Sequence, residues 1–180
     1  MAYGTQSGGY STLAKTLHWL VAICVLSIVT IAFWMSNAPE GPLQNRLFML
    51  HKSLGMLILI LMVLRIANRL IAGAPAPDPT LEPWQRKASS AVHGLLYLLV
   101  LAMPVIGYVG HSAFGVSTPF FGLFEFPPII GKNEPLSEKL FVLHRYLGWA
   151  VTAVVVLHIG AALQHYFIRR DRVLQRMLPG

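Results

Sequence analysis

Two short stretches of the sequence are nearly the same five residues. HKSLG begins at His51 and HRYLG begins at His144, and each pairs a histidine with a cation and with a glycine four residues later. An imidazole nitrogen can ligate a metal or carry a proton. In a helix, the glycine lies one turn from the histidine on the same face, where it leaves room for a neighbouring group. The repeat therefore predicts two histidine sites of the same kind.

The composition indicates that these histidines lie in a membrane. The chain has 180 residues, of which 55% are hydrophobic and 12% charged, and its mean hydropathy is +0.59. These values are too apolar for a soluble domain of this length, so we expect an integral membrane protein. Cys24 is the only cysteine. A disulfide within the chain, a C-x-x-C-H haem attachment and a cysteine zinc site are therefore excluded.

Four apolar segments are long enough to cross a bilayer, which takes about 20 helical residues. The first is too long for a cleaved signal peptide and is expected to be retained. We predict an all-α, four-helix membrane bundle forming a single domain. The expected spans lie near residues 13–35, 47–71, 88–111 and 140–167, with a flexible tail at 1–12 and a basic cytoplasmic tail at 168–180.

The connecting segments differ in chemistry. The proline-rich stretch GAPAPDPTLEPW is expected to be an extended linker. The longest loop, rich in phenylalanine and carrying Pro127 and Pro128, is expected to be a folded cap at the membrane surface. Pro104 lies inside the third span and is expected to kink it.

The distribution of cations predicts the orientation, because cytoplasmic flanks carry an excess of Lys and Arg. Nine cations fall on one side of the predicted spans and five on the other. The nine are Lys15, Arg65, Arg69, Arg86, Lys87, Arg169, Arg170, Arg172 and Arg176, and the five are Arg46, Lys52, Lys132, Lys139 and Arg145. Both termini are therefore expected in the cytoplasm. The net charge of +7 follows mostly from this topology, and no nucleic-acid-binding motif is present.

The alternating spans give each histidine a depth. His51 and His144 begin spans at the outer side, whereas His18 and His93 begin spans at the cytoplasmic side. His158 follows His144 by 14 residues, which places it roughly 21 Å deeper on nearly the same helix face. We therefore expect His51 and His144 to meet at the outer depth, and His18 and His158 at the inner depth, with His93 nearby.

An ionisable side chain inside a membrane is a functional hypothesis, because an unpaired polar ring in hydrocarbon costs several kcal/mol. For any single histidine, a hydrogen bond to a neighbouring helix is an equally good explanation. For two facing pairs, with only the single Cys24 and almost no carboxylate inside the bundle, haem iron is the better explanation, since it accepts two axial imidazoles. Gly55 and Gly148 would then let a flat porphyrin approach the backbone, although small-residue helix packing could also explain them.

Several motifs together resemble the bacterial cytochrome b561 family of dihaem membrane proteins. They are LHWLVAI, MLHKSLG, LMVLRIANRL, AVHGLLYLLVLAMPVIGYV, LHRYLGW and VVLHIGAALQHYF, in the order of the family and covering essentially the whole chain after residue 10. The resemblance implies two haem b groups in the bacterial inner membrane. It implies His18 with His158 as axial ligands of the inner haem and His51 with His144 as those of the outer haem.

The resemblance also implies an activity, that of a superoxide oxidase. Superoxide would give an electron at the outer haem, steered there by Lys52 and Arg145, and ubiquinone would accept electrons at the inner side. His165 would hydrogen-bond the quinone, although an interfacial histidine with a wet edge is an equal alternative. His93 would line the same pocket or bond a neighbour, and His111 is expected to be solvated.

Two other functions stay open at this point. The same design occurs in cytochrome b relay subunits, which anchor a periplasmic dehydrogenase or another redox partner. A transporter with histidine proton relays is disfavoured, because four short-looped helices without acidic residues offer no substrate pathway. The cations beside the ligands could hold haem propionates or serve only topology and snorkelling. The candidates are Lys52, Arg145 and Arg46 for the outer haem and Lys15, Arg65 or Arg69 for the inner one.

Overall fold

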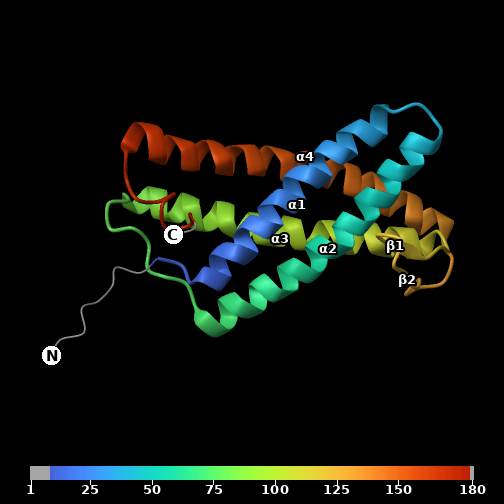
Figure 1. Ribbon diagram of the computed structural model, residues 1–180, viewed down its shortest axis with the longest axis horizontal. Helices are drawn as coiled ribbons and strands as arrows, with labels where there is room; N and C mark the ends of the chain where they lie inside the picture. The colour runs from blue at the N-terminus through green and yellow to red at the C-terminus, as the bar shows by residue number, and fades with distance from the viewer. Residues whose placement is uncertain (1–8, 179–180) are drawn as a thin grey trace.

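The computed structural model describes residues 9–178, which form four long helices and one short hairpin (Figure 1). The elements are α1 (Thr12–Asn37), α2 (Pro42–Ala72), α3 (Pro83–Ala113), β1 (Thr118–Phe120), β2 (Phe124–Phe126), α4 (Glu134–Gln164) and the π-helical turn η1 (His165–Arg169). Within this part of the chain, α1, α2, α3 and the run of α4 and η1 are each long and apolar enough to span a membrane. This confirms the prediction of four membrane-length helices.

Local sequence signals set where the helices begin. The Ser11 side chain accepts the Ala14 amide at 3.3 Å and caps α1. A capping box of Glu82 and Gln85 starts α3, and the Asn133 side chain accepts the Leu136 amide at 3.1 Å to start α4. These caps precede the apolar runs, so the helices are longer than those runs.

The early helix starts correct the expected positions of three histidines. His51, His93 and His144 were expected to begin their spans, but each lies between two and three turns inside its helix. The added turns are polar segments that the hydropathy pattern did not count as span. The side chains of His51 and His144 are partly buried there, whereas His93 is exposed.

The helices pack in sequence order, as α1 on α2, α2 on α3 and α3 on α4. A buried cluster of Val21, Val25, Ile58, Met62 and Val100 joins the first three helices. By contrast, among the described residues α4 makes hardly any close backbone contact with α1 or α2. α3 is thus packed closely against both α2 and α4, whereas α4 is not packed closely against α1 or α2.

Small residues bring α3 and α4 together. Ser137 of α4 is almost fully buried and donates to the carbonyl oxygen of Gly110 in α3 at 2.9 Å. A Cβ on Gly110 would lie 3.3 Å from Leu140 Cβ. Such close approach is usual between membrane helices, where small side chains let backbones pack tightly.

The two ends of the bundle differ. Figure 1 shows the start of α1, the end of α2, the start of α3 and η1 at one end, which we call the terminal end. The α1–α2 connection and the β1–β2 hairpin lie at the other, the hairpin end. In the hairpin, Thr118 pairs with Phe126 and Phe120 with Phe124. The loop expected to be a folded cap is therefore ordered. Of the expected extended linker, Pro83 and Trp84 instead belong to α3.

The C-terminal segment folds back on the terminal end. The Trp19 indole donates to the Met177 carbonyl oxygen at 2.8 Å, and Arg176 donates to the Ala76 carbonyl oxygen at 2.7 Å. Residues up to 178 of the predicted basic tail are thus tied to α1 and to the α2–α3 connection. Most of the predicted flexible tail, residues 1–8, and residues 179–180 lie outside the described residues.

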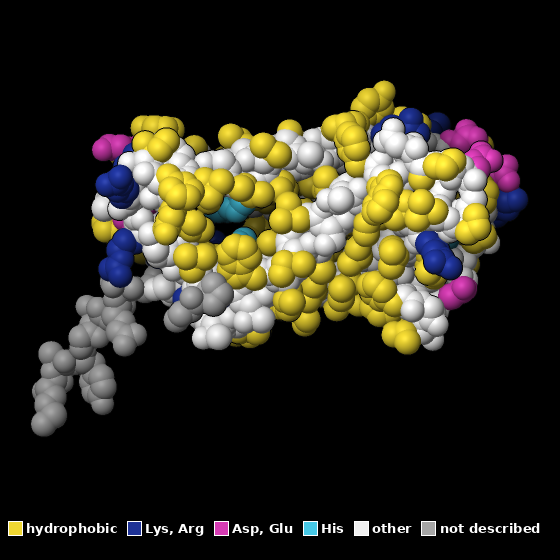
Figure 2. All heavy atoms as spheres, turned by 45° about the horizontal axis from the view of Figure 1, so that its top comes forward, with side chains coloured by type: hydrophobic (Ala, Val, Ile, Leu, Met, Phe, Trp, Pro, Cys, Tyr) yellow, Lys and Arg dark blue, Asp and Glu magenta, His cyan; other side chains and the backbone are white. Residues whose placement is uncertain are grey.

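Polar and apolar side chains are segregated on the surface. Figure 2 shows hydrophobic side chains covering the flank of the bundle, while Lys, Arg, Asp and Glu gather at its two ends. Leu70 and Ile71, for example, are 79% and 87% exposed. A soluble monomer rarely exposes so much contiguous apolar surface, whereas a lipid-facing bundle must.

Candidate functional site

The first site is a pair of histidines nearer the hairpin end. His51 of α2 and His144 of α4 have ring centroids 6.1 Å apart, with ring planes at 74°. The pair crosses the interface where the α2 and α4 backbones stay apart. The Nδ1 atoms of both rings are buried and have no hydrogen-bond partner among the described residues. Because an unpaired buried polar atom costs about 1–3 kcal/mol, these two atoms make the pair a candidate site for a ligand.

A cavity of about 1270 Å³ surrounds this pair. Gly55, Gly148, Lys52 and Arg145 line it together with the two histidines. A Cβ on Gly55 would meet only Ile28 Cδ1, and a Cβ on Gly148 only Met103 Cε, both at 3.8 Å. No protein atom therefore requires glycine at either position. The cavity is large enough for a cofactor-sized ligand.

A third glycine, not predicted from the sequence, lies directly against this histidine pair. A Cβ on Gly107 of α3 would lie 3.1 Å from His144 Cε1 and 3.4 Å from His144 Nδ1. Gly107 also lines the cavity. Glycine here lets α3 approach the back of the His144 ring. No sequence signal near Gly107 marks it, because the contact is between helices.

The second site is a cluster of three histidines nearer the terminal end. His18 of α1 and His158 of α4 have ring centroids 6.3 Å apart, with planes at 75°. His93 of α3 lies closer, 5.3 Å from His158, and its Nδ1 is 3.3 Å from the Ser89 hydroxyl. Figure 2 shows histidine side chains at the floor of a hollow in the half of the molecule nearer the terminal end. The structure thus brings together all three histidines predicted at the inner depth.

The ring separations test whether an iron would fit. Metal–imidazole bonds of about 2 Å, with about 1.2 Å from each nitrogen to its ring centre, put the two rings roughly 6.4 Å apart. The 6.1 Å of His51 and His144 and the 6.3 Å of His18 and His158 match this separation. The 5.3 Å between His93 and His158 is about 1 Å too short. The residues present therefore fit two bis-imidazole irons.

A bare metal ion is a poorer explanation of the same residues. Structural and catalytic zinc sites use three or four protein ligands. Within residues 9–178, no group of three or more His, Cys, Asp or Glu side chains converges as an ion site. A porphyrin supplies the four equatorial nitrogens itself and asks the protein for only two axial ligands.

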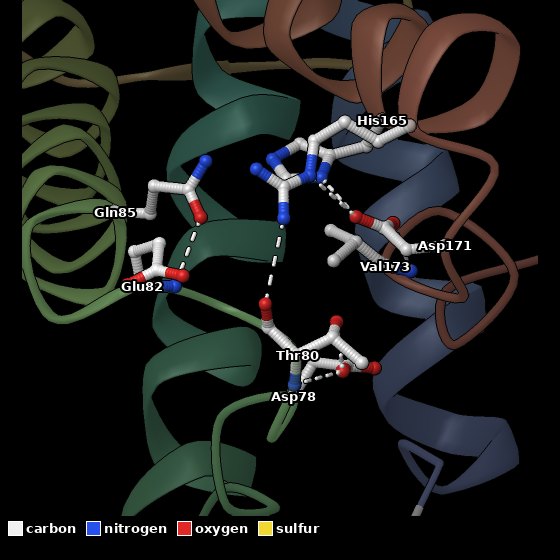
Figure 3. Close-up of polar contacts among 8 residues, drawn as sticks. Asp78, Thr80, Glu82, Gln85, His165, Asp171 and Val173 are labelled. Carbon is white, nitrogen blue, oxygen red and sulfur yellow. Dashed lines mark hydrogen bonds and ion pairs between the residues drawn. The ribbon is translucent and has the colours of Figure 1, made fainter.

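At the terminal end, His165 belongs to a polar network (Figure 3). Its Nδ1 lies 2.5 Å from Asp171 Oδ2, which also accepts from Arg169 Nε at 3.2 Å. Arg169 in turn donates to the Thr80 carbonyl oxygen at 3.4 Å. Burial works to raise the pKa of the Asp171 carboxyl, but hydrogen bonds from His165, Val173 and Arg169 outweigh it and hold that pKa below its usual range.

The Asp171 pairing was not part of the sequence prediction. His165 follows His158 by seven residues, which is two helical turns, and its side chain is 14% exposed. Asp171 is the one acidic residue in the basic run RRDRVLQR. That isolated carboxylate was an available signal, but only the reversal of the chain after η1 brings it to His165.

At the hairpin end, a chain of hydrogen bonds corrects the expectation for His111. Lys52 Nζ lies 3.0 Å from His111 Nε2, and His111 Nδ1 lies 3.0 Å from Thr118 Oγ1. All three residues line the cavity around His51 and His144. His111 was predicted to be solvated because it is near a helix end. Its side chain is instead partly buried, and both its ring nitrogens have protein partners.

Comparison with known proteins gives consistent matches. Residues 9–180 match the family model described as prokaryotic cytochrome b561. The chain is 32% identical over 188 residues to "Cytochrome b561 homolog 2" of Escherichia coli, covering 99% of this chain and 95% of that protein. It is 33% identical over 170 residues to "Probable superoxide oxidase CybB" of Yersinia pestis, covering 94% and 96%. It is 29% identical over 182 residues to "Cytochrome b562" of Cereibacter sphaeroides, covering 97% and 98%.

These matches span nearly the whole of each relative. The four membrane-length helices and the two histidine pairs are what a membrane cytochrome with b-type haem requires. The chain belongs to the prokaryotic cytochrome b561 family and is a multi-pass membrane protein of cytochrome b561-type electron transfer.

Proposed function

We propose that the protein is a dihaem b cytochrome of the bacterial inner membrane that transfers electrons from superoxide to ubiquinone. The observation that carries this proposal is the presence of two histidine pairs with iron-spanning separations, roughly 21 Å apart along α4. Two superoxide anions, one quinone and two protons would give two dioxygen molecules and one quinol. Charge and atoms balance, and two one-electron donors serve one two-electron acceptor.

The axial ligands in this proposal are His51 with His144 near the hairpin end and His18 with His158 near the terminal end. When bound, haem supplies reversible one-electron chemistry, while the protein sets its ligands, its spacing and access to it. Gly55 and Gly148 would give clearance to the outer porphyrin. His93, whose ring is too close to His158 for a bridging iron, would pack beside the inner site without ligating it.

The hairpin end would face the periplasm and both termini the cytoplasm, as the excess of cations at the terminal end favours. Lys52 and Arg145 line the outer cavity and would give it a positive field. Such a field raises the encounter rate of a small anion. A relative carrying the name "Probable superoxide oxidase" supports the choice of superoxide.

At the terminal end, His165 would bind a quinone oxygen. Asp171 occupies His165 Nδ1, so the ring is oriented and its Nε2 is the nitrogen left for a ligand. Reduction of the quinone consumes two protons at this side. A histidine–carboxylate pair next to the cytoplasmic surface is suited to deliver a proton to the quinone oxygen.

A second candidate is an electron-relay subunit that docks a periplasmic redox partner. The observation in its favour is the apolar tip of the hairpin, where Leu123 is 77% and Phe124 51% exposed. Solubilisation in mild detergent, followed by affinity purification of the full chain, would test it. A stoichiometric second subunit carrying its own redox group would favour the relay function.

The proposed activity is tested by mixing the purified, oxidised protein rapidly with a pulse of superoxide and following the haem α and Soret bands. We expect superoxide to reduce the haem quickly both with and without added ubiquinone, and the haem to be reoxidised only when ubiquinone is present. Arg145→Met, which removes a cation that lines the cavity, should slow this reduction, whereas Lys139→Met, which removes a cation at the same end that does not line it, should not. If the bands respond to dithionite but not to superoxide, the assignment as a haem cytochrome would stand and the proposed superoxide oxidase activity would be refuted.

A further inference from the structure

We propose that Lys52, His111 and Thr118 form a carboxylate-binding site in the wall of the outer cavity. The proposal rests on the function proposed above, since it requires a haem between His51 and His144. The carboxylate would be a propionate of that haem or a soluble carboxylate entering from the periplasm. Neither His111 nor Thr118 had a functional role before the structure placed them in this chain.

The direction of the hydrogen bonds between Lys52, His111 and Thr118 follows from Lys52. A lysine ammonium only donates, so His111 Nε2, 3.0 Å away, must accept. His111 is then protonated at Nδ1 and donates to Thr118 Oγ1 at 3.0 Å. Two ammonium protons of Lys52 and the hydroxyl proton of Thr118 remain available. These three residues therefore leave three proton donors available to a ligand in the cavity.

The position of each member is fixed by a different element. Lys52 comes from α2, His111 from the last turn of α3, and Thr118 from β1. The next residue of α2, Ser53, is fully buried and fixes β1: its hydroxyl lies 3.1 Å from the Pro119 carbonyl oxygen and accepts the Phe121 amide at 2.9 Å. The site is therefore built before any ligand arrives, which lowers the entropy lost on binding.

A carboxylate fits this site better than a bare small anion. Lys52 directly follows His51, so its backbone is anchored beside an axial ligand of the outer haem. The cavity that holds the histidine pair continues to Lys52, His111 and Thr118. Lys52 keeps two ammonium donors for the oxygens of a carboxylate, while His111 and Thr118 fix the position of the ammonium group. Charge-assisted bonds of this kind are among the strongest in proteins.

One carboxylate of the chain itself could compete for the site. Glu125 of β2 lines the same cavity and lies close enough to Lys52 to act on it electrostatically. Among the described residues, however, Glu125 forms no ion pair with Lys52 within 4.0 Å. If Lys52 holds a carboxylate, its charge is largely neutralised. Steering of a diffusing anion then falls mainly to Arg145.

The test is a redox titration of the purified haem-loaded protein, resolving the two haems by their α bands. Removal of a positive charge near a haem disfavours the ferrous form. We expect Lys52→Met to lower the outer potential by a tenfold change in the ferric-to-ferrous equilibrium, which is 59 mV for one electron, and to leave the inner potential unchanged. Thr118→Val and His111→Leu should lower it less, and each should add little to Lys52→Met in the double variant.

Three controls make the result decisive. Lys132→Met removes another cation at the hairpin end, one whose side chain is 63% exposed and paired with Glu134 at 2.8 Å, and it should leave both potentials unchanged. Glu125→Gln should not reproduce the Lys52→Met effect. Titration with acetate separates the two sources: a propionate gives an outer potential insensitive to acetate, whereas a soluble carboxylate gives one that depends on acetate only while Lys52 is present.

The failures are distinguishable. A wild-type protein with no outer haem would overturn the proposed function itself. A normal outer haem whose potential moves no more in Lys52→Met than in Lys132→Met would overturn the carboxylate site alone. The same holds if Glu125→Gln lowers or raises the outer potential as much as Lys52→Met, because Lys52 would then serve the chain's own carboxylate. Additive effects in the double variants would show that the three residues do not act as one site.

Discussion

With two haems bound as proposed, Gly107→Ala should disturb the outer haem and spare the inner one. The new methyl group would lie 3.1 Å from His144 Cε1, about 0.3 Å inside the distance at which ordinary contact begins. The atoms behind that methyl belong to the α3 backbone, and α3 is packed against α4. Since α3 cannot easily retreat, we expect the His144 ring to move instead.

The size of the effect follows from two tolerances. Metal–ligand distances are held to about 0.2 Å, so a forced shift of about 0.3 Å is larger than the coordination bond accepts. Overpacking a well-packed interior by one methyl group costs about 1–3 kcal/mol. If this cost falls on ligation, haem binding weakens roughly 5- to 150-fold.

The assay is the haem-to-protein ratio by pyridine haemochrome, together with resolved α-band redox titration. For Gly107→Ala we expect a ratio falling from two toward one, or an altered outer band and potential, with the inner band unchanged. Gly94→Ala is the matched control. Gly94 lies on the same helix as Gly107, and a Cβ there would meet nothing within 4 Å outside its chain neighbours and the adjacent helix backbone. Full haem content with wild-type bands in Gly107→Ala would refute the placement of His144 as an axial ligand against α3.

Three further predictions concern the terminal end. His158→Leu should remove one haem whereas His93→Leu should keep both, as measured by pyridine haemochrome, because only His18 is at an iron-spanning distance from His158. Trp19→Phe removes the 2.8 Å bond to the Met177 carbonyl, worth about 1 kcal/mol, and should speed amide exchange in residues 170–178 several-fold; unchanged exchange would contradict this. The lowered pKa of Asp171 stabilises this segment above the unfolded pKa of about 3.9, so exchange corrected for intrinsic rate should rise as pH falls through the folded pKa, and Asp171→Asn should abolish that dependence.

The sequence predicted those features that depend on composition and periodicity. Four apolar runs of membrane length gave four helices, and the 14-residue spacing of His144 and His158 put both rings on one side of α4. The meeting of His51 with His144, and of His18 with His158, also follows from alternating spans, since the order of the helices fixes the depths.

Contacts made by side chains between elements were not predictable in this way. Hydropathy cannot detect that Gly107 clears the His144 ring, because the requirement lies on another helix. The polar caps that start α3 and α4 ahead of the apolar runs moved His93 and His144 inward from the expected helix starts. His111 was misjudged for the same reason, since its partners on α2 and β1 are distant in the sequence.

The loose contact of α4 with α1 and α2 explains why one helix serves both sites. Helices that packed closely on α4 would fill the space between facing rings with side chains, as the α3–α4 interface does through Ser137 and Gly110. Instead, α4 is supported along α3 and left open toward the other two helices, so one ring meets α2 and the other meets α1. Removing both haems should therefore loosen α1 and α2 against α4 while leaving α3 and α4 packed. Hydrogen exchange of the apoprotein that rose equally in all four helices would contradict this division.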